Sequence, residues 1–306
     1  MAQHSSIVRL GLIQHACPVD ADPQKTVDKA VEMIRDAAGQ GAQIVATQEL
    51  FRTFYFPQTE DERNLELAEP IPGPTSQRLC DLARELGIYL TASLFEKRAQ
   101  GLYHNTSIMI DPKGQIIGKY RKMHIPDDPR FFEKYYFTPG DPPLPGQRDS
   151  GAAAGWQVQD TAYARTGMLI CWDQWFPEAA RLTALRGAQI LFYPTAIGWY
   201  HGETDYDRKQ QREAWMTIQR AHAIANGVFV AAINRVGVEK DLTFWGSSFV
   251  ADPGGTIIAQ ADQTSEQVLI ADCDLSKIDI YRQGWPFLRD RRIDAYSELT
   301  RRLIDE

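Results

Sequence analysis

Short apolar runs alternate with amphipathic stretches along most of this chain. Residues 7–14 form an apolar run that predicts a strand, and Asp22-Pro23 then supplies a helix N-cap followed by a proline in the first turn. Apolar side chains at helical spacing follow up to Gly39: Val27, Ala30, Val31, Ile34, Ala37 and Ala38. Residues 44–46 then predict a short buried strand. Alternating strands and helices are typical of an α/β layered fold.

The same alternation continues through the rest of the chain. Further helices are expected at residues 76–86, 177–186 and 207–226, and further strands at 88–94, 156–160, 164–170, 190–193, 228–233 and 268–271. Turn signals predict two hairpins, at 103–120 around DPKG and at 247–259 around DPGG. Residues 125–155 are rich in Pro, Gly and Asp, and they predict a long functional loop anchored by its aromatic side chains. A polar, Arg-rich tail begins at residue 276.

Two short segments recur in the same order and with similar spacing. GAQI at residues 41–44 returns at 187–190, and DPKGQII at 111–117 returns as DPGGTII at 252–258. Together the repeats predict two pseudo-equivalent halves that form one sandwich, with the sheets inside and the helices outside. We therefore expect a single domain over residues 1–306.

Composition and charge exclude several classes of partner. Acidic residues exceed basic ones by 40 to 33, and no Lys/Arg cluster is interleaved with aromatic residues, so nucleic acid is not an expected partner. The N-terminus has no basic region followed by a long apolar core, and no stretch approaches the roughly 18 apolar residues of a membrane span. We expect a cytoplasmic protein that does not bind membranes.

Several catalytic motifs are missing from the sequence: the G-x-S-x-G elbow, a complete P-loop, the Rossmann G-x-G-x-x-G and H-E-x-x-H. The 6 histidines show no ligand spacing, so a metal site is not expected. The 4 cysteines form no C-x-x-C pair and would remain thiols in a reducing compartment. Cys17, Cys80 and Cys273 are expected to be small buried hydrophobic residues.

The remaining cysteine is the candidate nucleophile. GMLICWDQWFPE, residues 167–178, runs from an apolar strand through Cys171 to a helix start. A thiol needs a base or a positive neighbour to react at neutral pH, and a developing oxyanion needs a positive or N–H partner. Glu49 and Lys122, each at or just beyond a predicted strand end, are suited to these two roles. Position alone favours ordinary roles for all three, as a core cysteine and solvated charges.

Several segments together resemble the nitrilase, or carbon–nitrogen hydrolase, superfamily. They are GAQIVATQELF at 41–51, GKYRKMHIPDD at 118–128, GMLICWDQWFPEAARL at 167–182 and the hairpin near Asp252, and the similarity extends from about residue 7 to residue 299. Within the superfamily, YRKMHIPDDP at 120–129, FFEKYYFTPGD at 131–141 and CWDQWFPE at 171–178 are most similar to N-carbamoylputrescine amidohydrolases.

This resemblance implies an α/β fold, a four-layer α-β-β-α sandwich of the nitrilase type, and a Glu-Lys-Cys triad. By position, Glu49 matches the general base, Lys122 the oxyanion-stabilising lysine, and Cys171 the nucleophile, while Glu133 matches a second glutamate that positions the lysine and the substrate nitrogen. The backbone N–H of Trp172 would share the oxyanion with the lysine.

The chemistry that the resemblance implies is a cofactor-free hydrolysis of a C–N bond in a small linear N-carbamoyl amine or amide, through a thioester-type intermediate. N-carbamoylputrescine, giving putrescine, CO2 and ammonia, is the leading substrate. Family members pair face to face, so the resemblance also implies a dimer or higher homo-oligomer, with residues 276–306 as a C-terminal extension used in subunit contacts.

The chain departs from those amidohydrolases in two places. Residues 141–155 are an insertion expected to form a surface loop at a subunit contact or the pocket rim. Where the amidohydrolases follow Thr-Ala-Ile-Gly with Ser-Glu-Pro, which places an acid at the distal ammonium of the substrate, this chain has WYHGE at 199–203.

The altered loop leaves the substrate's tail open. Acidic residues that can replace the missing charge are Glu203, Asp205 and Asp127, whereas Tyr200 and Trp199 are equally suited to line a pocket for an apolar tail. The expected substrate-binding set is therefore Trp172, Tyr200, Glu203, Asp127 and Thr195.

Two other functions remain open. An ω-amidase or an N-carbamoyl amino-acid (β-ureido acid) hydrolase would need an arginine for the substrate carboxylate, and Arg52, Arg130 and Arg235 are the candidates. A catalytically silent member of the fold, acting as a binding or scaffolding subunit, is the alternative of another class. The intact triad argues against it.

Overall fold

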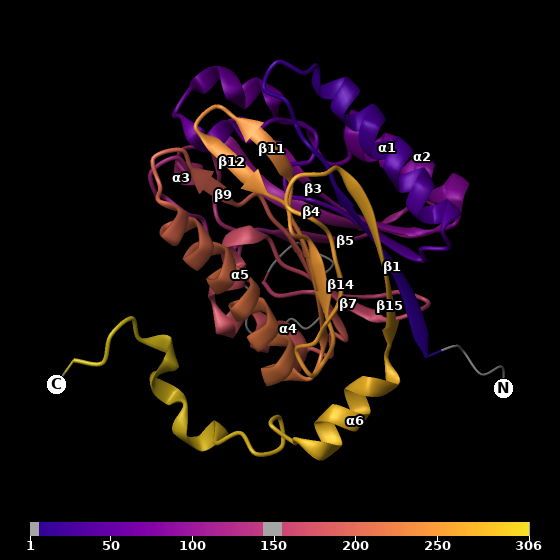
Figure 1. Cartoon of the computed structure of the whole chain (residues 1–306), viewed down its shortest axis with the longest axis vertical. Coiled ribbons are helices and arrows are strands. Elements are labelled where there is room, and N and C mark those ends of the chain that lie inside the picture. Colours follow the sequence, from indigo (N-terminus) through magenta and orange to yellow (C-terminus); the bar gives the residue numbers. More distant parts are fainter. Residues whose placement is uncertain (1–5, 143–154, 306) are drawn as a thin grey trace.

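Two six-stranded sheets stack at the centre of the structure, and helices cover both outer faces (Figure 1). The computed structural model describes residues 6–142 and 155–305. From edge to edge, the first sheet contains β15 (Gln267–Asp274), β1 (Ile7–Gln14), β2 (Ile44–Thr47), β3 (Tyr89–Ala99), β4 (Leu102–Ile110) and β5 (Ile116–Arg121). The second contains β14 (Ile257–Gln260), β13 (Phe249–Ala251), β10 (Phe229–Ile233), β8 (Ile190–Pro194), β7 (Arg165–Met168) and β6 (Val158–Asp160). The chain therefore has the expected four-layer α-β-β-α sandwich.

The two sheets repeat one topology. Three central strands run parallel in each, β1, β2 and β3 in the first and β7, β8 and β10 in the second. An antiparallel hairpin continues each sheet on one side, β4–β5 and β13–β14, and one antiparallel strand, β15 or β6, completes the other. The GAQI segments lead into β2 and β8, which are equivalent in this scheme. The two halves predicted from the repeats are therefore present.

Side chains of the central strands are apolar on both faces because both faces are covered. Leu12 of β1 and Phe192 of β8 lie in the cluster between the two sheets. Their chain neighbours Ile13 and Leu191 point the other way, into the clusters beneath the outer helices. Burying both faces fixes the register of each strand, since a slip of one residue would exchange its two faces. Fixed registers in turn fix where each strand ends.

The helices form the outer layers. α1 (Pro23–Gly39) and α2 (Pro74–Leu86) cover the first sheet, and α4 (Pro177–Leu185) and α5 (Asp205–Asn226) cover the second (Figure 1). Asp22 caps α1 as predicted, because its side chain accepts a hydrogen bond of 2.9 Å from the backbone N–H of Gln24. Equivalent glycines in β1 and β7 let a helix approach each sheet closely. A Cβ at Gly11 would lie 2.8 Å from Ala37 Cβ, and one at Gly167 would lie 2.3 Å from Thr183 Cγ2.

Some elements were not predicted. A small three-stranded sheet contains β11 (Val236–Glu239), β12 (Leu242–Trp245) and β9 (Gly198–Tyr200). The helix α3 (Glu133–Tyr136) lies inside the predicted long loop, where Tyr136 and Phe137 are buried. Short 3-10 turns occupy residues 56–58, 62–67, 171–175, 293–295 and 297–300.

The predicted insertion lies largely outside the described residues, which omit 143–154. Its two ends meet, because the backbone N–H of Gly155 donates a hydrogen bond of 2.8 Å to the carbonyl oxygen of Asp141. The insertion therefore leaves the sandwich and returns to it at one place.

The C-terminal segment departs from the sandwich after β15. Here α6 (Ser276–Gly284) and the residues after it extend along the outside of the body of the protein, shown in yellow in Figure 1. Several apolar side chains of this segment are exposed, including Trp285, Ile293 and Leu303. None of the helices within 6–142 and 155–305 combines the length and apolar character that a membrane crossing requires.

The close contact at Gly167 generates a stability prediction. We expect Gly167→Ala to lower the free energy of unfolding by about 1–3 kcal/mol, because the added methyl group overpacks the contact with Thr183. The matched control is Gly39→Ala at the end of α1, where a Cβ meets nothing within 4 Å. Urea denaturation followed by circular dichroism measures both variants. Equal stability of the two would contradict the proposed close packing of α4.

Candidate active site

Three buried charged side chains meet where strands of the first sheet end. Glu49 follows β2, Lys122 follows β5, and Glu133 begins α3. The Nζ atom of Lys122 lies 2.8 Å from Oε1 of Glu49 and 2.6 Å from Oε2 of Glu133. All three side chains are fully buried. A single ammonium group therefore bridges two carboxylates inside the protein, at the positions predicted for the base, the lysine and the second glutamate.

The pKa values of Lys122 and Glu133 are shifted by burial and by the neighbouring charges. Burial alone would lower the pKa of Lys122, but Glu133 and Glu49 outweigh it and the pKa is raised, so the side chain stays an ammonium at neutral pH. Burial raises the pKa of Glu133, the positive charge of Lys122 opposes this, and the charge of Glu49 adds to the rise. The cluster thus has one firmly held positive charge between two acids.

Each acid has a further hydrogen-bond partner. Asn105 Nδ2 donates a bond of 2.7 Å to Oε1 of Glu49, and the Tyr55 hydroxyl donates one of 2.7 Å to Oε1 of Glu133. Asn105 is itself held by Ser93, whose hydroxyl donates to Oδ1 over 3.1 Å. The second oxygen of Glu49, Oε2, is buried and has no hydrogen-bond partner within the described part of the chain. One carboxylate oxygen is thus fixed while the other is open to accept a proton.

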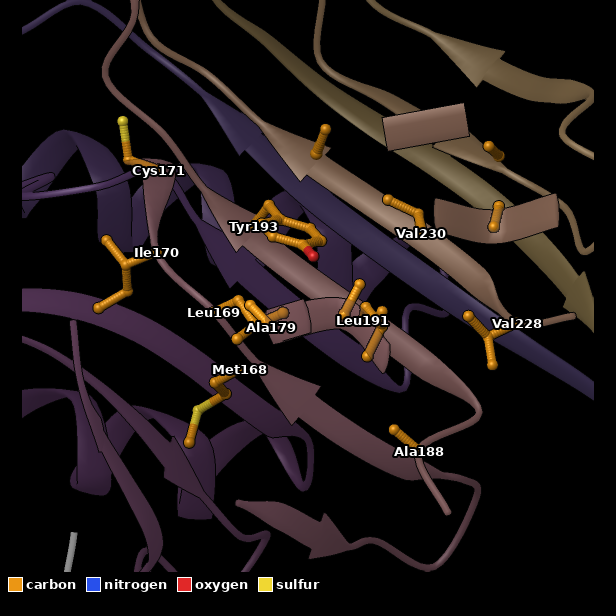
Figure 2. Packing of buried hydrophobic residues seen from close by; sticks show 14 of the residues in the cluster. Met168, Leu169, Ile170, Cys171, Ala179, Ala188, Leu191, Tyr193, Val228 and Val230 are labelled. Carbon is orange, nitrogen blue, oxygen red and sulfur yellow. The ribbon is translucent and has the colours of Figure 1, made fainter. Parts of the chain in front are cut away.

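Cys171 begins a turn directly after the β7 strand region. Figure 2 shows Met168, Leu169 and Ile170 leading to Cys171 at the edge of the cluster of buried apolar residues. The backbone of Cys171 has a φ of 42°, in the left-handed region that a residue with a side chain seldom adopts. Such strain persists only where the surroundings enforce it, and it is concentrated at functional sites.

Asp173 is the residue that holds this turn. Its Oδ2 accepts hydrogen bonds from the backbone N–H of Ile170 at 2.9 Å and from the hydroxyl of Tyr120 at 2.8 Å, and its Oδ1 lies 2.8 Å from Nδ1 of His124. Tyr120 and His124 flank Lys122 in the sequence. Asp173 therefore ties the turn of Cys171 to the segment that carries the lysine.

The Cys171 thiol is electrostatically linked to the charged cluster. Burial raises its pKa well above the usual range, and Glu49 adds to the rise, while Lys122 and the backbone N–H of Ala196 act in the opposite direction. The thiol is consequently protonated at neutral pH. A nucleophile at this position therefore requires a base.

Gln174 forms a buried polar centre behind the turn. Its Oε1 accepts hydrogen bonds from Trp215 Nε1 at 2.8 Å and from the hydroxyl of Thr195 at 3.2 Å, and its carbonyl oxygen lies 2.7 Å from Nε2 of His222. Thr195, expected among the substrate-binding residues, is fully buried, and its hydroxyl also contacts the carbonyl oxygen of Tyr193. The structure thus places Thr195 in the support of the Cys171 turn.

The other expected substrate-binding residues lie outside the buried cluster. Trp172 is half-buried and Asp127 is exposed. Tyr200, at the end of β9, is 39% exposed, and the guanidinium of Arg130 lies 4.8 Å from its ring centroid. Glu203 accepts hydrogen bonds from the backbone N–H of Tyr200 at 3.1 Å and from the side chain of Gln211 at 2.8 Å.

The three candidate arginines have different surroundings. Arg52 donates to the carbonyl oxygen of Leu67 and pairs with Glu69, and Arg130 pairs with Asp241. Arg235 is fully buried and donates to three backbone carbonyl oxygens of residues 49–53. Arg235 is therefore a structural residue, because its guanidinium is engaged by the protein's own backbone.

Some contributors were not predicted from the sequence. Asn105, Tyr55 and Asp173 each bind a member of the site or its backbone. Asp173 had a usable signal, since it follows the candidate nucleophile by two positions. Cys17, Cys80 and Cys273 are buried free thiols, as predicted. Within the described residues, no group of three or more His, Cys, Asp or Glu side chains is arranged to hold a metal ion.

Relatives of known activity match almost the whole chain. N-carbamoylputrescine amidase from Solanum lycopersicum is 42% identical over 98% of this chain and 97% of its own length. Citrullinase from Francisella tularensis is 41% identical over 90% of this chain and 92% of its own. The omega-amidase NIT2 of Homo sapiens is 33% identical over 94% of this chain and 96% of its own.

Solved structures share the fold. A carbon–nitrogen hydrolase from Helicobacter pylori G27 superimposes with a TM-score of 0.90 at 42% identity, covering 97% of this chain and 100% of that one. An amidase variant from Nesterenkonia, with the acetamide moiety of fluoroacetamide added covalently at its active-site cysteine, superimposes with a TM-score of 0.74 at 27% identity, covering 95% of this chain and 96% of that one. The carbon–nitrogen hydrolase family profile matches residues 9–283. The chain therefore belongs to the carbon–nitrogen hydrolase family, and it is a hydrolase of carbon–nitrogen bonds other than peptide bonds.

Proposed function

We propose that this hydrolase converts N-carbamoylputrescine to putrescine, CO2 and ammonia through a covalent intermediate on Cys171. The observation that carries the proposal is the fully buried Lys122 ammonium, bridged by Glu49 and Glu133, with the Cys171 thiol in their electrostatic field. The identity of 42% to N-carbamoylputrescine amidases over nearly the whole chain supports the substrate.

In the first proposed step, Glu49 accepts the thiol proton through its open oxygen. The sulfur of Cys171 then adds to the ureido carbon, and the electron pair of the carbonyl bond moves to oxygen. The ammonium of Lys122 and the backbone N–H of Trp172 stabilise that oxyanion. Because burial keeps the resting thiol protonated, deprotonation and attack are coupled to the arrival of a substrate that excludes water.

In the second step, the tetrahedral adduct collapses and its C–N bond breaks. Ammonia leaves with the proton that Glu49 had taken, and an S-carbamoyl group bearing the putrescine chain remains on Cys171. Water, deprotonated by Glu49, then displaces the sulfur, which recovers its proton. The released carbamic acid decomposes to putrescine and CO2. Glu133 has a positioning role here, because its carboxylate also holds the ammonium of Lys122.

The substrate's distal ammonium is proposed to lie near the partly exposed loop residues. Glu203 uses both carboxylate oxygens for Tyr200 and Gln211, and each oxygen can accept a further hydrogen bond. Asp127 is exposed and offers a second acid, and the ring of Tyr200 is proposed as the wall of the pocket between them.

A hydrolase of N-carbamoyl amino acids is the second candidate. It is favoured by the citrullinase relative, since citrulline carries a ureido group and a carboxylate. Arg130 stays partly exposed beside Tyr200 and is the proposed partner of that carboxylate. The omega-amidase relative supports a further group of acidic substrates, the monoamides of dicarboxylic acids.

We also propose that the chain forms homo-oligomers, with residues 276–306 in the contact. Trp285 is 59% exposed and Leu303 is 73% exposed, and neighbouring apolar residues of the same segment are exposed with them. Several large apolar side chains exposed within one segment mark an interaction site more often than an isolated apolar residue does.

The substrate is tested by measuring ammonia release from N-carbamoylputrescine, citrulline, N-carbamoyl-β-alanine and glutarate monoamide side by side. We expect the highest kcat/KM for N-carbamoylputrescine, because the loop acids complement its ammonium. A preference for citrulline that is lost in Arg130→Gln would establish the second candidate instead.

The covalent route is tested by replacing the nucleophile. Cys171→Ala and Cys171→Ser are expected to lower kcat by more than about a thousandfold, since the remaining residues stabilise the oxyanion but form no intermediate. Cys80→Ala, on α2, is the control and should keep wild-type kcat. Substantial hydrolysis by either purified Cys171 variant would falsify the thioester-type mechanism.

Oligomer formation is tested by light scattering coupled to size-exclusion chromatography. The wild type should elute as a dimer or larger, and Trp285→Ser combined with Leu303→Ser should reduce its mass toward that of the monomer. Val238→Ser, another exposed apolar position, should leave the mass unchanged. A monomeric wild type at micromolar concentration would end the proposal.

A further inference from the structure

A buried ion pair lies behind the loop that carries Glu49. Arg235 follows β10, Glu239 ends β11, and Nη1 of the arginine lies 2.9 Å from Oε1 of the glutamate. The two side chains are 0% and 1% exposed. Neither belongs to the charged cluster around Lys122, and the steps proposed above assign no task to either.

The arginine binds the backbone of the loop after β2. Its Nη2 donates to the carbonyl oxygens of Glu49 at 2.6 Å and Leu50 at 3.1 Å, and its Nη1 donates to that of Thr53 at 3.1 Å. Leu50 has a φ of 48°, in the left-handed region. Three carbonyl oxygens thus converge on one guanidinium in a loop whose backbone is strained, and they would be left without these donors if the guanidinium were removed.

The glutamate of the pair binds the other end of the same loop. Its second oxygen, Oε2, accepts a hydrogen bond from the backbone N–H of Tyr55. The hydroxyl of Tyr55 donates to Glu133, the second acid that contacts Lys122. The ion pair therefore binds the backbone of the loop at Glu49 and at Tyr55. These two residues connect the pair to both carboxylates that contact Lys122.

We propose that Arg235 and Glu239 are positioning residues of the hydrolase, which fix the carboxylates of Glu49 and Glu133 relative to Lys122 and Cys171. The inference rests on the proposed function of Glu49 as the base. A buried ion pair contributes little net stability, because the cost of desolvating both charges offsets their attraction. What this pair provides is geometry: a planar guanidinium presents several donors in a fixed fork, which is suited to holding adjacent carbonyl oxygens.

The test distinguishes a loss of catalytic geometry from a loss of stability by replacing both charged residues with apolar ones. Arg235→Met alone leaves the Glu239 charge buried and unpaired, so we expect a large fall in thermal stability. Arg235→Met combined with Glu239→Leu removes both charges, and its melting temperature should recover toward the wild-type value. Its kcat should nevertheless stay about a hundredfold below the wild type with KM little changed, as for a misplaced catalytic group.

Two single variants complete the series. Arg235→Lys keeps the charge but not the fork, so kcat should be intermediate between the wild type and the double variant. Arg84→Met is the matched control, because Arg84 on α2 also pairs with a carboxylate and donates to a carbonyl oxygen, that of Lys113. It should keep the wild-type kcat.

A second readout does not depend on the substrate. Alkylation of Cys171 by iodoacetamide, followed by peptide mass spectrometry, requires deprotonation of the thiol but no recognition of a substrate tail. In the double variant, alkylation at neutral pH should be slower, because the base is displaced from the sulfur. If N-carbamoylputrescine proves not to be hydrolysed while alkylation slows in this way, the inference stands and the substrate proposal fails. A folded double variant with wild-type alkylation kinetics would overturn the inference.

Discussion

The placement of the Lys122 ammonium inside the protein is the constraint on which the rest of the site depends. Removing a lysine from water costs several kcal/mol, and only close opposite charges offset that cost. Glu49 and Glu133 supply them, at 2.8 and 2.6 Å. These three residues come from the ends of β2 and β5 and from α3, so the buried charge can form only when both strand ends and the segment that carries α3 are in place. The fold and the charged cluster are consequently inseparable.

The two halves share one topology, so equivalent strands end at equivalent places. The residues at these equivalent positions differ between the halves, and only one charged cluster is therefore formed. Counted from the first residue of each strand, Glu49 has the same position relative to β2 as Thr195 has relative to the equivalent strand β8. Likewise Cys171, beyond β7, matches His15 beyond β1 by strand register. Thr195 contacts Gln174 behind the turn of Cys171. The second half therefore supplies the thiol and its support, and the first half supplies the charges.

Local signals in the sequence were sufficient for most of the sandwich. The cap at Asp22, the two hairpin turns and the strand ending near Cys171 each depend on neighbouring residues, and each was predicted. The strands β9, β11 and β12 are too short to show the alternation of apolar and polar residues that predicts a strand. The roles of Asn105 and Arg235 depend on contacts across the fold, since Arg235 and Glu49 are 186 positions apart. The resemblance to a family identified Glu49, Lys122 and Cys171, but spacing by itself did not.

The protonated resting state of Cys171 has a consequence for how the site is built. A thiol kept reactive by a permanent positive neighbour would tolerate small displacements, because it would already be a thiolate. Here burial raises the pKa of the thiol, and Glu49 raises it further. In the proposed mechanism, reactivity therefore exists only while a carboxylate lies close enough to take the proton. A backbone that holds Glu49 rigidly is then as necessary as the glutamate itself, which is why a buried ion pair with little net contribution to stability belongs behind this loop.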